Sequence, residues 1–234
     1  MKFLAGLLAL VAFGTAGCAR QTPVAAAPTP SPALTTPAAT PDNLWHLQLS
    51  TGGEVVVQLR PDVAPNHVAR IKQLTRAGFY DGVVFHRVID GFMAQTGDPQ
   101  GTGLGGSPLP DLKAEFNDLP HVRGTVSMAR AQSADSANSQ FFITFMPVLR
   151  LDRTYTAFGR VTQGMQFVDA IPRGEGDDGA VPVEQRARVV KAWIEADGPS
   201  APRVPLPVAA APLPTSPTVP APTPPPAQPA PPTN

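Results

Sequence analysis

The chain has 234 residues, with eighteen basic and eighteen acidic side chains and a formal net charge of zero. It lacks the basic stripe that a phosphate backbone requires, so we expect no nucleic-acid partner. Its thirty prolines are concentrated at the two ends, six between Gln21 and Pro41 and fifteen between Pro199 and Asn234, so the middle segment must supply the core.

Residues 1–17 have the features of a signal peptide. Lys2 precedes an apolar run from Phe3 to Phe13, and small residues follow it up to Cys18. The run is shorter than the ~20 apolar residues that a membrane-spanning helix needs. The pattern therefore predicts a cleaved export signal rather than a permanent anchor.

Cys18 is the only cysteine, so no intramolecular disulfide can form. The junction Thr15-Ala16-Gly17-Cys18 resembles the lipobox of bacterial lipoproteins, in which the cysteine receives lipid and becomes the new N-terminus. Thr15 stands where leucine is usual, and an ordinary secretory peptide with an incidental cysteine is the alternative. Lipidation at Cys18 would hold the chain on a bacterial membrane in the cell envelope, with the rest of the chain outside the cytoplasm.

Residues 18–41 are rich in proline, alanine and threonine, a composition that cannot bury enough apolar area to form a core. We expect an extended tether there. Residues 199–234 repeat the composition and are predicted to be a disordered tail, either a solvated spacer or a proline-rich ligand for another module. The folded domain is predicted to span residues 42–198.

The domain begins with two strand-like runs and a helix. Leu44 to Ser50 and Glu54 to Arg60 are joined by a glycine-containing turn, which predicts a β-hairpin. Pro65 opens a run with apolar residues at helical spacing, and Gly78 closes it as a C-terminal cap.

Further strand-like runs follow in chain order: Gly82 to Ile89, Phe92 to Thr96, Gly124 to Ala129, Gln140 to Phe145, Ala157 to Thr162 and Ala187 to Ala196. Residues Gly164 to Ala170 predict a second, short helix. About eight short strands with two helices predict an all-β dominated fold. We expect a closed eight-stranded antiparallel β-barrel capped by two α-helices and flanked by disordered proline-rich segments.

Several motifs appear in one order along this segment: Phe85 to Ile89, Gly91 to Gln95, Gly97-Asp98, Gly101 to Gly103, Ser127 to Ala129, Ser139 to Ile143 and Phe158 to Val161. Together they resemble the cyclophilin family of peptidyl-prolyl cis-trans isomerases. The resemblance covers the globular segment and neither proline-rich end. It implies a barrel whose interior is filled by side chains, with the substrate groove on the outer face.

The resemblance assigns the chemistry to Arg87. Rotation about a prolyl peptide bond gives its nitrogen a lone pair in the twisted transition state, so a fixed hydrogen-bond donor there stabilises that state selectively. Arginine stays protonated and offers several donors. His86, next to it on a strand, points to the other face and is interpreted as structural rather than catalytic.

The resemblance also assigns the substrate-binding residues. A pocket for the proline ring is expected from Phe92, Met93, Phe142 and Leu151, with Tyr155 in place of the histidine of many relatives. Phe141, the strand neighbour of Phe142, is expected in the core. Contacts to the substrate backbone are expected from Gln95, Gln140, Ala129 and Arg130, and the neighbouring groove from Gly101 and Thr102.

Like Tyr155, Arg130 and Arg150 depart from the family pattern. Arg130 replaces a groove asparagine. Arg150 stands where eukaryotic relatives have a tryptophan that contacts cyclosporin, so we expect cyclosporin to inhibit this protein weakly. We expect no metal and no cofactor, because the four histidines lack metal-ligand spacing. The glycine-rich stretch lacks the ending of a phosphate loop.

The leading hypothesis is an isomerase that accelerates rotation about Xaa-Pro bonds in extracytoplasmic proteins during folding, with proline-containing polypeptides as its partners. We expect a monomer. The alternative is a membrane-tethered chaperone or scaffold that binds proline segments with little turnover.

Overall fold

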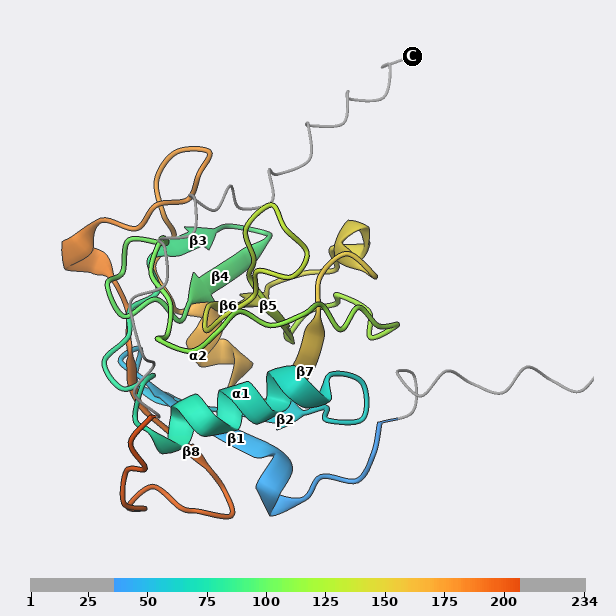
Figure 1. Cartoon of the computed structure of the whole chain (residues 1–234). Coiled ribbons are helices and arrows are strands. Elements are labelled where there is room, and N and C mark those ends of the chain that lie inside the picture. Colours follow the sequence, from blue (N-terminus) through green and yellow to red (C-terminus); the bar gives the residue numbers. More distant parts are fainter. Residues whose placement is uncertain (1–35, 207–234) are drawn as a thin grey trace, which may run out of the picture.

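The computed structural model describes residues 36–206 (Figure 1). The predicted signal peptide, Cys18, most of the tether and the tail from residue 207 lie outside these residues. Within 36–206, no helix combines the length and the apolar character needed to cross a bilayer.

Eight strands form one antiparallel sheet in the described residues, in the spatial order β3-β4-β6-β5-β7-β2-β1-β8. The strands are β1 Leu44–Leu49, β2 Gly53–Leu59, β3 Arg87–Ile89, β4 Met93–Thr96, β5 Thr125–Met128, β6 Phe141–Thr144, β7 Ala157–Gln163 and β8 Val189–Ile194. Their number and order along the chain confirm the strands predicted from sequence. The predicted strand from Gly82 is shorter than expected, because only its last three residues are regular.

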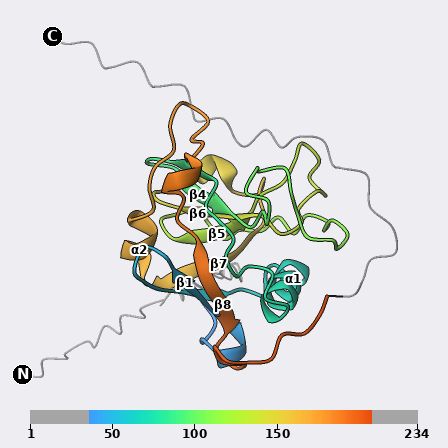
Figure 2. The same ribbon diagram turned by 90° about the vertical axis from the view of Figure 1, so that its left-hand side faces the viewer.

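Two α-helices accompany the sheet, α1 Pro65–Arg76 and α2 Met165–Asp169, with short 3-10 turns η2 Pro41–Asn43, η3 Leu149–Leu151 and η4 Val183–Gln185. Helix α1 packs against β8 and α2 against β2, and Figure 2 shows the two helices on opposite sides of the strands. Gly78, at φ +74°, ends α1 as predicted. Its N–H donates to the carbonyl of Thr75 and that of Phe79 to the carbonyl of Leu74, the two bonds of a Schellman cap.

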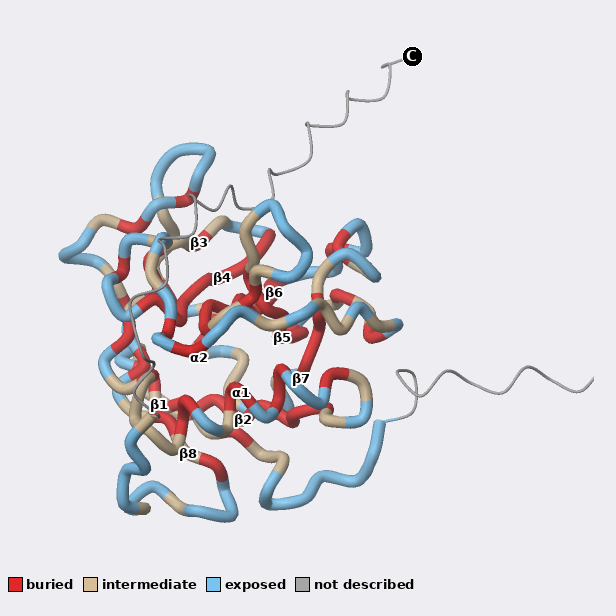
Figure 3. The backbone as a smooth tube through the Cα atoms, in the orientation of Figure 1, coloured by how far each residue is buried: buried red, intermediate tan, exposed pale blue. Residues whose placement is uncertain are grey.

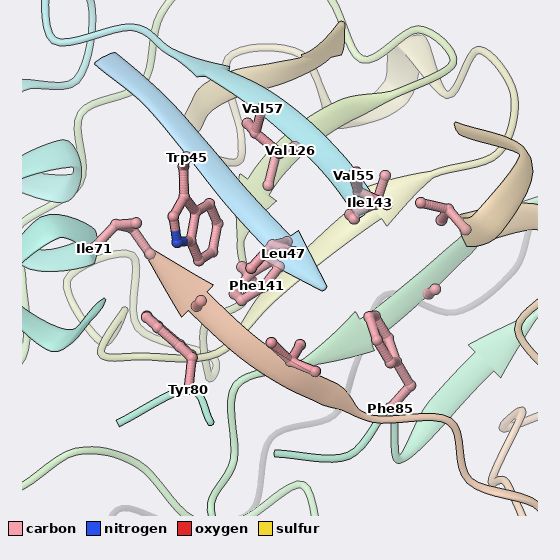
Figure 4. Close-up of a cluster of buried hydrophobic side chains, with 14 of the residues drawn as sticks. Trp45, Leu47, Val55, Val57, Ile71, Tyr80, Phe85, Val126, Phe141 and Ile143 are labelled. Atoms are coloured by element: carbon pink, nitrogen blue, oxygen red, sulfur yellow. The ribbon is translucent and has the colours of Figure 1, made fainter. Parts of the chain in front are cut away.

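The main core lies between the sheet and α1. On β1 the alternate residues Trp45, Leu47 and Leu49 are buried, which is the period of two that a half-buried strand requires. The Trp45 ring lies 5.0 Å from the ring of Phe141, centroid to centroid, and Figure 4 shows both among the buried side chains, with Ile71 of α1. Each such side chain contributes roughly 1.5–3 kcal/mol of burial free energy. Buried backbone follows the strands and exposed backbone follows the loops (Figure 3).

The sheet is open, so the prediction of a closed barrel is wrong in this respect. The edge strands β3 and β8 do not pair in the described residues. The outer edge of β3 is occupied by the loop 174–180: the N–H of Val88 donates to the carbonyl of Gly179, and the N–H of Gly174 donates to the carbonyl of Val88. The irregular chain before β3 bonds to β8 instead: Val84 and Arg188 form an isolated bridge, the N–H of Gly82 donates to the carbonyl of Val189, and the N–H of Val189 donates to the carbonyl of Val83. The loop 174–180 therefore occupies the edge of β3, and β8 meets only the segment that precedes β3.

The folded body extends beyond the predicted boundary at residue 198. The N–H of Val204 donates to the carbonyl of Arg76 at the end of α1, and Arg203 pairs with Asp81. The side chain of Leu206 packs against the main core. Residues 199–206 are therefore part of the described body, although the sequence assigns them to the tail, because their apolar and basic side chains find partners on α1 and β8.

Candidate active site

The register of three neighbouring strands, β3, β4 and β6, places several predicted site residues on one face. Arg87 of β3 pairs with Gln95 of β4, and Gln95 pairs with Phe142 of β6. Directly paired residues project to the same side of a sheet. The alternate row, which contains Val88 and Ala94, is buried in the main core. The row that contains Arg87 therefore lies on the opposite, outer face.

Arg87 is held by two contacts. Its Nε donates to the backbone carbonyl of Asp178 at 2.6 Å, and its Nη1 donates to Oε1 of Gln95 at 3.4 Å. Burial lowers the pKa of Arg87, and the charges of Asp178 and Tyr155 oppose that shift. A guanidinium remains protonated at neutral pH in spite of such a shift. Three of its five N–H donors have no partner among the described residues, so they are free to meet a substrate.

Beside this arginine lies a small apolar cluster, separate from the main core, which we call the ring pocket. Its six buried members are between 1% and 9% exposed: Phe92, Met93, Ala129, Phe142, Val148 and Leu151, with Ile89 and Tyr155 packed against them. The rings of Phe142 and Tyr155 meet edge to face at 5.8 Å between centroids. The structure thus brings together all the apolar residues predicted for the proline ring, and their role stays a prediction.

The division between Phe141 and Phe142 follows the alternation predicted from sequence. Phe141 belongs to the main core and Phe142 to the ring pocket. Phe142 is only 2% exposed. It therefore lies deep in the ring pocket.

Gln95 and Gln140 form a hydrogen-bonded chain that leads away from Arg87. Nε2 of Gln95 donates to Oε1 of Gln140 at 2.9 Å. Nε2 of Gln140 donates in turn to the carbonyls of Gly103 and Gly105, at 2.9 and 2.8 Å. Both the oxygen and the nitrogen of the Gln95 side-chain amide are therefore hydrogen-bonded within the protein. Its position between Arg87 and Gln140 supports a role in orienting the guanidinium, in addition to the substrate contact predicted from sequence.

The glycine-rich loop 97–106 is organised around Asp98, whose side chain is fully buried. The carboxylate accepts hydrogen bonds from the N–H groups of Gln100, Thr102 and Gly103 and from the Thr102 hydroxyl. Burial favours the neutral acid, but these bonds together hold the pKa of Asp98 below its ordinary value.

Gly101 and Thr102 occupy different positions in this loop. Gly101 is buried at φ +66°, where an added Cβ would lie 2.8 Å from Val84. Its carbonyl accepts a hydrogen bond from Arg186. Gly101 thus faces the body of the protein, while Thr102 is exposed.

Arg130 and Arg150 stack on two aromatic side chains of the ring pocket. The guanidinium carbon of Arg130 lies 4.6 Å from the centroid of the Tyr155 ring, and that of Arg150 lies 5.1 Å from the centroid of the Phe92 ring. Both distances are within the range of cation–π attraction. Arg130 and Arg150, two of the three departures from the family pattern, are therefore neighbours of one pocket.

Sequence reasoning missed His121, which lies behind the ring pocket. Its ring stacks on Phe142, with centroids 6.2 Å apart. Nδ1 contacts the carboxylate of Asp152 at 2.9 Å and Nε2 contacts the hydroxyl of Ser127 at 3.0 Å. Burial lowers the pKa of His121 in spite of the contact with Asp152. No local sequence signal joins these three residues, since the fold brings them together from the segment before β5, from β5 itself and from the residue after η3.

Val148 and Asp178 were also missed. Val148 lies in the ring pocket but belongs to no motif. Asp178 acts through its backbone carbonyl, for which residue type gives no signal. His86, interpreted from the sequence as structural, is buried, and neither ring nitrogen has a hydrogen-bond partner among the described residues. Burial lowers the pKa of His86 to about 4, so the ring is neutral at pH 7.

A family model described as "Cyclophilin type peptidyl-prolyl cis-trans isomerase/CLD" matches residues 46–193. A probable peptidyl-prolyl cis-trans isomerase of Brucella suis is 51% identical over 175 residues, covering 70% of this chain and 88% of the relative. Peptidyl-prolyl cis-trans isomerase B of Bacillus subtilis is 43% identical, covering 56% of this chain and 91% of the relative.

Solved structures agree with the fold. The crystal structure of the cyclophilin AquaCyp293 from Hirschia baltica aligns with a TM-score of 0.61 at 29% identity, covering 68% of this chain and 76% of the other. A cyclophilin type isomerase from Cryptosporidium parvum, solved in the presence of the dipeptide Ala-Pro, aligns with a TM-score of 0.59 at 27% identity, covering 64% and 98%. The half-barrel with two helices is thus a cyclophilin-like fold, and the chain belongs to the cyclophilin-type peptidyl-prolyl cis-trans isomerase family and is an enzyme of that class.

Proposed function

We propose that this isomerase acts on proteins that fold outside the cytoplasm, with Arg87 as the catalytic residue and the ring pocket as the site of the substrate proline. One observation carries the assignment of the site. The pairing of β3, β4 and β6 sets a protonated donor with unused N–H groups on the same face as an apolar cluster that is separate from the core.

The reaction needs a donor of this kind. Resonance gives the peptide C–N bond a rotation barrier of about 18–20 kcal/mol. As the bond twists, resonance is lost and the proline nitrogen becomes pyramidal with a lone pair. The guanidinium of Arg87 donates to that lone pair, an interaction that the planar ground state cannot make, so it lowers the barrier.

Arg87 must be fixed in place to act in this way. The carbonyl of Asp178 and the amide of Gln95 hold two sides of the guanidinium. Gln95 is itself held by Gln140, which is tied to the loop 97–106. The donors are therefore oriented before the substrate binds, and little reorganisation is needed in the transition state.

The ring pocket supplies the second requirement, a dry site that holds the proline ring while the preceding residue rotates. Phe92, Met93, Phe142 and Leu151 present apolar atoms, and such contacts favour binding of both isomers equally. We assign contacts to the substrate backbone to Ala129, Arg130 and Gln140. The structure of the Cryptosporidium parvum relative was solved in the presence of the dipeptide Ala-Pro, which supports a site for a proline-containing ligand.

The extracytoplasmic location rests on the N-terminal sequence. Lys2, the apolar run that follows it and the junction at Cys18 support export and lipidation. The proline-rich stretch after Cys18 supports a tether that keeps the domain at a distance from the membrane. We propose that the enzyme is anchored in the cell envelope and assists folding there.

Activity is tested with the full-length chain and a peptide that contains one Xaa-Pro bond. Exchange spectroscopy measures the interconversion of the two isomers and, in the same titration, the affinity of the peptide. Accelerated exchange is expected. A folded chain that binds the peptide without accelerating exchange would contradict the assignment and favour a proline-binding chaperone.

A further inference from the structure

The loop 174–180 lies beside Arg87 in the way that a neighbouring strand would. Arg87 and Ala180 face each other in an antiparallel bridge. The N–H of Val88 donates to the carbonyl of Gly179 at 2.8 Å, which fixes the spacing of the two backbones at this point. Because directly opposed residues project to the same side, the loop and the side chain of Arg87 share one face of the sheet.

The two limbs of this loop are joined to each other. The N–H of Glu175 donates to the carbonyl of Ala180 at 2.9 Å. The N–H of Ala180 donates to Oδ1 of Asp178 at 3.1 Å, and an aspartate that accepts from the N–H two residues ahead forms an Asx turn. With the side chain of Asp178 held in this turn, its backbone carbonyl accepts the hydrogen bond from Nε of Arg87 at 2.6 Å.

Gly179 allows the loop to approach β3 this closely. It is buried, and its φ of +69° is a conformation that residues with a Cβ rarely adopt. A Cβ at this position would overlap Cγ1 of Ile89 and lie 2.9 Å from the carbonyl oxygen of Val88. Gly174 is required for a similar reason, because a Cβ there would overlap the carbonyl oxygen of Gly179. The position of the Asp178 carbonyl therefore depends on glycine at both places.

The contact with the loop is the shorter of the two that hold Arg87. Nε donates to the Asp178 carbonyl at 2.6 Å, whereas Nη1 donates to Oε1 of Gln95 at 3.4 Å. Hydrogen bonds weaken as they lengthen. A guanidinium is planar, so a fixed Nε determines the directions of the donors that remain. The loop therefore supplies the main constraint on the orientation of Arg87.

We propose that Asp178 and Gly179 are positioning residues for catalysis. The Asx turn of Asp178 and the left-handed conformation of Gly179 direct a backbone carbonyl at Nε of Arg87, and turnover depends on that direction although neither residue acts on the prolyl bond itself. The inference rests on the proposed catalytic function of Arg87. Misplacement of a catalytic group by about 1 Å reduces a rate by about a hundredfold. Since Gln95 still holds Nη1, loss of the turn should reduce kcat by about three- to thirtyfold and leave KM within about twofold.

The first test compares two substitutions of Asp178 in the full-length chain, with kcat and KM measured by exchange spectroscopy on one Xaa-Pro peptide. Asp178→Ala removes the oxygen that accepts from Ala180, so kcat should fall as stated. Asp178→Asn keeps an oxygen in the same place and a residue type that forms the same turn, so its kcat should be within about twofold of that of the unmodified chain. Asp177→Ala, at the exposed neighbouring carboxylate, is the matched control and should leave kcat unchanged.

The second test observes the contact without a substrate. The NMR signal of the Nε–H of Arg87, assigned by its loss in Arg87→Lys, should exchange slowly with water while it is bound to the Asp178 carbonyl. Asp178→Ala and Gly179→Ala should each accelerate this exchange by about threefold or more, and Asp178→Asn should not. Thermal unfolding of each variant shows whether it is folded, and a loop with only a structural role would lower stability without this selective change at Arg87.

Two results would overturn the inference. Folded Asp178→Ala and Gly179→Ala variants with normal kcat would show that the loop does not position Arg87. An equal loss of kcat in Asp178→Ala and Asp178→Asn would assign the effect to the charge of the carboxylate rather than to the turn. Normal turnover in Arg87→Ala, or no turnover in the unmodified chain, would instead overturn the proposed function, on which this inference depends.

Discussion

Replacing Arg87 by alanine should reduce turnover far more than peptide affinity. In the structure, two of its five N–H donors are engaged, by the carbonyl of Asp178 and by Gln95. The remaining three are available to the twisted prolyl nitrogen. Loss of such a donor in a partly buried site costs about 2–4 kcal/mol of transition-state stabilisation, which corresponds to about 30- to 1,000-fold in kcat.

The affinity for the peptide should change much less, because the apolar contacts of the ring pocket remain. Arg87→Lys should give an intermediate rate, since a single ammonium cannot hold both the Asp178 carbonyl and Gln95 while it donates to the substrate. Arg87→Ala also leaves the Asp178 carbonyl and the Gln95 side-chain oxygen without their donor, which lowers the free energy of unfolding by roughly 1–2 kcal/mol.

Exchange spectroscopy on one Xaa-Pro peptide reports turnover and affinity together, and circular dichroism with thermal unfolding confirms that each variant is folded. Arg160→Ala is the matched control, because it removes an exposed arginine from β7 outside the ring pocket. It should behave as the unmodified chain. A folded Arg87→Ala variant with near-normal turnover would show that Arg87 is not the catalytic group.

Three further predictions concern the pocket, the pH dependence of stability and the anchor. Phe142→Leu removes ring contacts made by both isomers and the transition state, so binding and turnover should weaken together; reduced turnover at unchanged affinity would contradict this. Burial lowers the pKa of His86 from 6.5 to about 4, so between pH 6.5 and pH 4 the histidine binds a proton mainly in the unfolded chain. The free energy of unfolding should therefore fall by up to about 3 kcal/mol as the pH decreases over this range. Urea unfolding at several pH values should show a weaker pH dependence for His86→Phe; identical curves would refute the reasoning. Cys18→Ser should move the protein from membrane to soluble fractions and abolish incorporation of labelled lipid, and unchanged labelling would rule out this anchor.

The sequence by itself determined the family, the number of strands and the face of several side chains. These properties depend on short-range patterns. Side chains alternate between the two faces of a strand, which places Phe141 in the core and Phe142 on the opposite face. A glycine after an amphipathic run, Gly78, ends α1. The motif around Arg87 is local as well, so it could be identified without knowledge of the partners that hold the arginine.

Tertiary structure alone decided which residues support Arg87 and how the sheet ends. The Asp178 carbonyl is a backbone group, and every residue has one, so no residue type could indicate that contact. Gln95, Gln140 and the loop carbonyls of Gly103 and Gly105 form a chain only because β3, β4 and the loops meet in one register. The open sheet has the same origin: the loop 174–180 occupies the edge of β3 and β8 bonds to the chain before β3, through backbone hydrogen bonds that depend on position in space rather than on side-chain pattern.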